Sequence, residues 1–98
     1  MTSLPLPGPA VTLVTAAGCH LCDDAHATLE ELVGKGFPVV FEVVEATSER
    51  GRSLLTEHRP PMNPLVLVDG SYFSAGRLPR RKLEALLRSR HAIGADRG

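Results

Sequence analysis

The two cysteines of this 98-residue chain, Cys19 and Cys22, are separated by only His20 and Leu21. A β-branched run ends shortly before them and apolar residues recur at helical spacing from Leu21 onward, so Cys19 falls in a strand-to-helix loop and Cys22 in the first helical turn. Unpaired N–H groups and a partial positive charge at a helix N-terminus stabilise a thiolate. The pattern therefore predicts thiol–disulfide exchange in which Cys19 attacks a substrate disulfide and Cys22 resolves the mixed disulfide. A protonated His20 would favour the Cys19 thiolate further, so His20 is predicted to tune its pKa.

The same residues allow two other interpretations. Both cysteines and His26 fit a C-x2-C-x3-H metal pattern, with His20 as a fourth donor. Closed zinc sites usually draw two ligand pairs from distant segments, and His58 and His91 are the remaining histidine candidates. The pair could also be buried and inert, although a strand–loop–helix setting is where thiols become reactive. We therefore favour a redox pair, with no metal or other cofactor, and His26 by itself is typical of a helix surface.

Length and composition indicate one domain without nucleic-acid or membrane partners. The chain is 43% hydrophobic and 22% charged, which is within the range of globular proteins. Equal numbers of acidic and basic residues and 4% aromatic residues disfavour nucleic-acid binding. Two close cysteines do not form a disulfide framework, the proline-interrupted N-terminus does not resemble a signal peptide, and no apolar stretch approaches the roughly 18 residues of a membrane span. The expected location is the cytoplasm.

The zero net charge conceals two segments of opposite sign. Residues 1–76 carry four basic and nine acidic side chains, whereas residues 77–98 carry seven basic and two acidic ones. Such a division usually reflects solvated faces of opposite charge, but a basic helix can also dock an acidic partner.

The elements that position the cysteines follow the order β-α-β-α-β-β-α. The first two strands should be parallel through a helical crossover, and the Asp69-Gly70 turn should join an antiparallel hairpin. The near-continuous apolar character of the second strand predicts burial on both of its faces. We expect a flexible lead-in at residues 1–9, a domain at 10–90 and a frayed tail at 91–98. The predicted strands cover residues 11–15, 39–44, 65–68 and 71–74, and the predicted helices cover about 21–33, 48–58 and 79–90.

The chain resembles the glutaredoxin family, within the thioredoxin-like fold. The resemblance covers residues 10–89 and rests on Gly-Cys-His-Leu-Cys-Asp at 18–23 and on Asn-Pro-Leu-Val-Leu-Val-Asp-Gly at 63–70. It implies an α/β fold with a four-stranded mixed sheet flanked by helices. It also implies that Pro64 is cis, and that Met62 and Asn63 present backbone to a disulfide substrate. Gly76 and Arg77 occupy the segment that precedes the last helix and are implied to contact substrate, with Arg77 able to face a carboxylate.

The resemblance implies a disulfide-containing protein or a glutathione mixed disulfide as substrate, and glutathione or a reductase as the reductant. Glutathione is a possible co-substrate rather than a bound cofactor. The chain departs from glutathione-using members in having small residues at 16–18 where a basic residue is usual, and His20-Leu21 between the cysteines. Two further hypotheses remain: a redox-silent module that docks an acidic partner through its basic C-terminal helix, and metal or iron–sulfur binding through Cys19.

Overall fold

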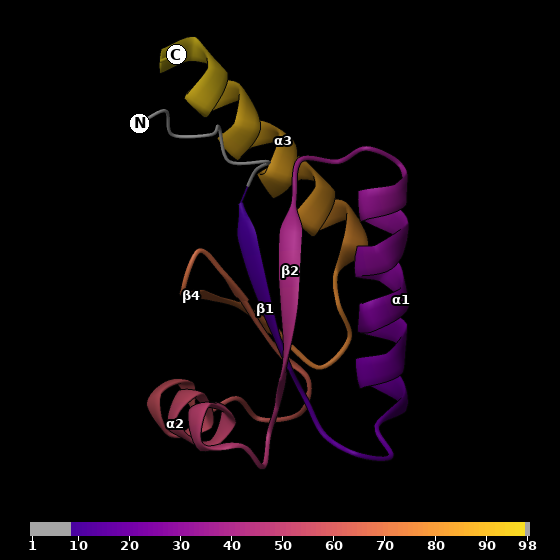
Figure 1. Cartoon of the computed structure of the whole chain (residues 1–98), viewed down its shortest axis with the longest axis vertical. Helices are drawn as coiled ribbons and strands as arrows, with labels where there is room; N and C mark the ends of the chain where they lie inside the picture. The colour runs from indigo at the N-terminus through magenta and orange to yellow at the C-terminus, as the bar shows by residue number, and fades with distance from the viewer. Residues whose placement is uncertain (1–8, 98) are drawn as a thin grey trace, which may run out of the picture.

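The computed structural model describes residues 9–97, which form four strands and three helices in the predicted order (Figure 1). The predicted lead-in falls almost entirely on residues 1–8, which lie outside the described part. The tail predicted at 91–98 falls on the last helix, which continues to residue 97; the side chains of 91–97 are not described, and residue 98 lies outside the described part. The elements are β1 (Ala10–Thr15), α1 (His20–Gly34), β2 (Val40–Glu45), α2 (Glu49–His58), β3 (Leu65–Val68), β4 (Ser71–Ala75) and α3 (Arg80–Arg97).

The strands form one mixed sheet in the order β2-β1-β3-β4. β1 runs parallel to β2 and antiparallel to β3, and β3 runs antiparallel to β4. Helices α1 and α3 pack on one face of the sheet and α2 lies on the other (Figure 1). This arrangement confirms the predicted α/β class, with a four-stranded mixed sheet flanked by helices.

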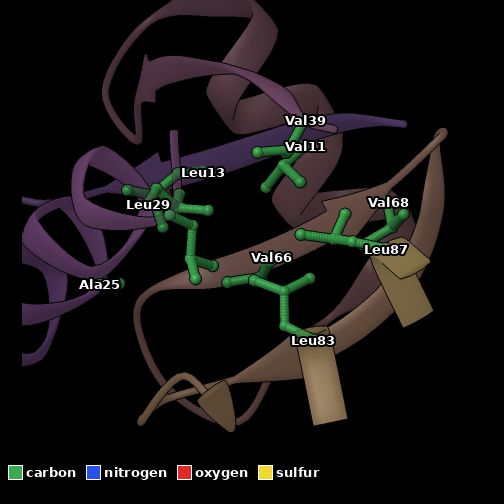
Figure 2. Packing of buried hydrophobic residues seen from close by; sticks show 10 residues of the cluster. Val11, Leu13, Ala25, Leu29, Val39, Val66, Val68, Leu83 and Leu87 are labelled. Atoms are coloured by element: carbon green, nitrogen blue, oxygen red, sulfur yellow. The ribbon is translucent and has the colours of Figure 1, made fainter. Parts of the chain in front are cut away.

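The main hydrophobic core lies between the sheet and helices α1 and α3. Leu13 of β1, Leu29 of α1 and Leu83 of α3 are fully buried in it, and Figure 2 shows these side chains converging between the ribbons. A second, smaller cluster lies between the sheet and α2, and Val14 of β1 belongs to it. β1 and β3 are the central strands, and all four residues of β3 are buried. The core therefore fixes the end of β1, which is followed by the segment with Cys19, and the start of β3, which is preceded by the segment with Pro64.

The prediction that β2 is buried on both faces is wrong. Val40 is 41% exposed and Val43 is 44% exposed, and Val44 is the one buried residue of this strand. β2 lies at the edge of the sheet, where the helices cover it only in part. A continuous apolar run is expected for a central strand, and here it also occurs at an edge.

Two arginines of the basic segment bind acidic residues of the first 76. Arg90 pairs with Asp69, which also accepts a hydrogen bond from the Ala10 amide. Arg80 pairs with Glu31 of α1. Opposite charges of the two segments therefore form ion pairs on the protein surface, and these pairs join α3 to the Asp69-Gly70 turn and to α1.

Candidate active site

Cys19 is the N-cap residue of α1. Its backbone is extended, with φ −103° and ψ 108°, and its Sγ accepts a hydrogen bond of 3.1 Å from the Cys22 amide. Gly18 precedes it with φ +69°, a left-handed conformation that suits glycine and turns the chain from the β1 end into the helix. An N-cap side chain ordinarily satisfies one of the free amides of the first turn, and here a sulfur does so.

Cys22 lies one turn further along α1 and is bonded to Cys19 through a disulfide, with the two Cα atoms 5.2 Å apart. The two cysteines differ in access: Cys19 is half-buried, whereas Cys22 is 2% exposed. The more accessible sulfur is therefore the one at the helix N-terminus, where a thiolate would be stabilised on reduction. His20 is exposed at the first position of α1, and its predicted effect on Cys19 stays a prediction.

The segment before β3 begins beside the segment that carries the cysteines. Val14 near the end of β1 pairs with Leu65 at the start of β3. The first residues after β1, which lead to Cys19, therefore lie next to Pro64, the last residue before β3. The Asn63-Pro64 peptide bond is cis, as the resemblance implied. Asn63 itself is half-buried, and Pro64 is buried.

Gly76 is packed against this segment. Its amide donates a hydrogen bond of 2.9 Å to the Pro64 carbonyl oxygen. Gly76 has φ +82°, and a Cβ atom on it would lie 2.7 Å from the Sδ atom of Met62. The structure therefore brings Met62, Pro64 and Gly76 together, with the Met62 side chain half-exposed above them.

Arg77 faces a groove on the α3 side of α1. The groove has a volume of about 380 Å³. Its lining includes Leu21 and Asp24 of α1, and Arg77, Leu78 and Arg80 at the start of α3 and just before it. Arg80 is held by Glu84 and Glu31, whereas Arg77 is exposed and has no ion pair among the described residues. The groove thus brings the Arg77 guanidinium into a common lining with Leu21, the residue that precedes Cys22.

A second cavity opens on the β2 side of the pair, and sequence reasoning missed it. It measures about 430 Å³, and its lining includes Gly18, Cys22, His26 and Val43. The i,i+4 spacing of Cys22 and His26 was available as a signal, but it was interpreted only as a metal pattern or a helix surface. Val43 keeps this side open because it is exposed at the edge of the sheet, where the apolar run predicts a buried strand.

Metal-binding geometry does not arise around the cysteines. Among the side chains that the structure describes, those of residues 9–90, there is no group of three or more histidine, cysteine, aspartate or glutamate residues placed to hold a metal ion. His58 lies on α2 beside Tyr72, at 6.3 Å between ring centroids, and the His91 side chain is outside the described part.

No protein-family model matches the chain, and no curated protein is similar to it in sequence. Solved structures do match. An uncharacterized thioredoxin-like protein from Clostridium perfringens superimposes with a TM-score of 0.66 at 13% identity, over 88% of this chain and 73% of that one. A thioredoxin from Arabidopsis thaliana in its oxidized state gives 0.61 at 17% identity, over 85% and 75% of the two chains. A mutant thioredoxin from Halobacterium salinarum gives 0.60 at 15% identity, over 85% and 74%.

The chain therefore has a thioredoxin-like fold, as the sequence predicted. It carries a close cysteine pair at the N-terminus of α1, an arrangement compatible with redox activity. Across the described residues, none of the helices has the length and apolar character needed to cross a membrane.

Proposed function

We propose that this protein is a dithiol–disulfide oxidoreductase with Cys19 as nucleophile and Cys22 as resolving cysteine. The observation that carries the proposal is the N-cap position of Cys19, whose Sγ accepts an amide hydrogen bond of 3.1 Å and is bonded to a buried cysteine three residues later. An N-cap sulfur receives both the hydrogen bond and the helix dipole, and both favour the thiolate that disulfide exchange requires.

The reaction begins from the reduced pair. The Cys19 thiolate forms a bond to one sulfur of the substrate disulfide, the substrate S–S bond breaks, and the released thiolate takes a proton from solvent. The Cys22 sulfur, after losing its proton, bonds to the Cys19 sulfur and releases the second substrate thiolate. The substrate gains two electrons and the cysteine pair becomes a disulfide, which an external thiol then reduces.

The substrate binds along the surface formed by Met62, Asn63, Pro64, Gly76 and Arg77. Met62 offers an exposed apolar side chain over Gly76, and the resemblance implies that Met62 and Asn63 present backbone to the substrate. The free guanidinium of Arg77 favours a substrate with a carboxylate near its disulfide. A protein disulfide flanked by an acidic residue and a glutathione mixed disulfide both meet this requirement. A glutaredoxin-like role in the cytoplasm, with glutathione or a reductase as electron donor, is the version of the proposal that follows the sequence resemblance.

Cysteine variants test the mechanism. Cys19→Ser should abolish turnover, while Cys22→Ser should retain the first attack and accumulate mixed disulfides that mass spectrometry detects. The ultraviolet absorbance of the thiolate in Cys22→Ser reports the ionisation of Cys19, which should occur well below the ordinary thiol value of about 8.5. An unchanged rate in Cys19→Ser, or ionisation of the Cys19 thiol at the ordinary value in Cys22→Ser, would contradict the assignment of Cys19 as the nucleophile.

Comparing two substrates tests the glutaredoxin-like version. The rates of reduction of a glutathione mixed disulfide and of a protein disulfide are measured side by side for the wild type and for Arg77→Gln. A substrate whose carboxylate binds Arg77 loses rate in Arg77→Gln, and a substrate without one does not. Preference for the protein disulfide would support a thioredoxin-like rather than a glutaredoxin-like role.

A further inference from the structure

The resolving step requires a thiolate at a position that does not stabilise one. Cys22 is 2% exposed, and burial disfavours the charged form of a thiol. The amide of Cys22 donates its hydrogen bond to the Cys19 sulfur, so the helix N-terminus serves Cys19. Cys22 therefore needs a group that accepts its proton.

The cavity on the β2 side of the pair supplies a route to such a group. Cys22 and His26 both line it, and they occupy i,i+4 positions on α1, where side chains lie about 5–6 Å apart at Cβ. The residues at 16–18 are small, and Val43 belongs to the exposed edge strand, so the cavity of about 430 Å³ is open to water. Cys22 contributes to the cavity wall while the rest of its surface is covered.

We propose that His26 is the proton acceptor for Cys22 in the resolving step, acting through water in this cavity. The inference rests on the proposed function and adds a residue to it. The proton of Cys22 passes to His26 as the Cys22 sulfur bonds to the Cys19 sulfur and the substrate thiolate leaves with the electrons of the broken bond. In the reverse direction, when a reductant attacks Cys19, the protonated His26 returns a proton to the departing Cys22 sulfur.

The charges around His26 suit a proton acceptor. Its Nδ1 atom lies 3.6 Å from the Glu30 carboxylate, and Asp23 and Glu45 line the same cavity. The ring of Phe41 meets the imidazole edge-on at 5.5 Å, and no lysine or arginine lines the cavity. Glu30 is therefore placed to pair with the imidazole once it has accepted the proton, two further carboxylates line the same cavity, and Phe41 of β2 contacts the ring. Histidine is also the side chain whose protonation ordinarily changes between about pH 5 and 8.

The test separates the two chemical steps. Reduced protein is mixed with an aryl disulfide, dithiobis-nitrobenzoate, whose thiol product absorbs visible light. Cys19 releases one equivalent in a phase that depends on reagent concentration, and Cys22 releases the second in a unimolecular phase. Both phases are followed by stopped flow across about pH 5 to 8 in wild type, His26→Ala, His26→Gln and, as control, His58→Gln on helix α2, which lies on the other face of the sheet.

His26→Ala and His26→Gln should slow the second phase by about 10²-fold near neutral pH and leave the first phase within about twofold. The wild-type second phase should show an inflection from the imidazole, which both variants lose. Free imidazole should restore the second phase of His26→Ala, because the cavity is open, and should not affect His58→Gln.

A second phase that keeps its wild-type rate and pH profile in His26→Ala would overturn the assignment. A slowed phase that neither changes its pH profile nor responds to imidazole would also overturn it, because it would show a structural role for the ring. Loss of the first phase in the wild type would instead refute the proposed function itself. The two failures are therefore distinguishable.

Discussion

Replacing Gly76 and Gly70 by alanine should separate a backbone effect from a contact effect. The two glycines have nearly identical left-handed conformations, with φ +82° and +83°. A Cβ atom on Gly70 would meet no atom within 4 Å, whereas one on Gly76 would lie 2.7 Å from the Sδ atom of Met62. Gly70 is thus a matched control for Gly76.

The expected magnitudes follow from those contacts. A left-handed residue with a Cβ costs about 1–2 kcal/mol, and this should be the whole effect of Gly70→Ala. Gly76→Ala carries the same cost and must also displace Met62, whose exposed flexible side chain can move for about 0.5–1.5 kcal/mol. The free energy of unfolding should therefore fall by about 1 kcal/mol more in Gly76→Ala than in Gly70→Ala.

Urea denaturation of the oxidised protein measures the loss of unfolding free energy in Gly70→Ala and in Gly76→Ala. In a Met62→Ala background the two glycine substitutions should become equal, because the displaced side chain is gone. Equal costs in the wild-type background would refute the packing of Met62 against Gly76. Reduction of a protein disulfide should slow in Gly76→Ala and stay unchanged in Gly70→Ala, since only the former moves a residue assigned to substrate binding.

Two further predictions concern the edge strand and α2. The pKa of Glu42 is lowered, chiefly by its hydrogen bond from Arg50. The stability that this pair contributes is therefore present above the ordinary carboxyl value of 4.5 and is lost as pH falls through the lower pKa of the folded state. Glu42→Gln should flatten the acid side of a plot of unfolding free energy against pH, and a slope equal to that of the wild type would contradict this prediction. Gly51→Ala should destabilise by about 3 kcal/mol in thermal melts, because its Cβ would lie 1.9 Å from the backbone oxygen of Glu45. Gly34→Ala, with open space around it, should stay within about 1 kcal/mol of the wild type, and a similar loss in both variants would refute the close approach of α2 to β2.

Local patterns in the sequence were sufficient for the order of the elements. The apolar positions Ala25 and Leu29 recur at helical spacing and are buried in α1, and Ser48 caps α2 by accepting a hydrogen bond of 2.9 Å from Gly51. The Asp69-Gly70 turn was predictable because both residues tolerate positive φ, which the structure gives as +51° and +83°. Each of these features depends on residues close together in the chain.

Features that depend on neighbours distant in sequence were not predictable in the same way. The apolar run of β2 does not reveal that the strand lies at an edge, because its position depends on where β3 pairs. The contact of Gly76 with Met62 joins the segment after β4 to the segment before β3. The open cavity beside Cys22 likewise needs β2 placed next to α1. These are tertiary relations, and residue type alone does not specify them.

The two sides of the cysteine pair have different surroundings, and this difference constrains the mechanism. Arg77 and Leu21 form a groove on the α3 side, while His26 and Cys22 share the cavity on the β2 side. A substrate that occupies the first groove leaves the second open to water. The proton of Cys22 can then leave while the mixed disulfide is still bound, so resolution does not have to wait for the substrate to move. A large side chain in place of Ala17 would narrow the second cavity alone, and it should slow the resolving step without weakening substrate binding.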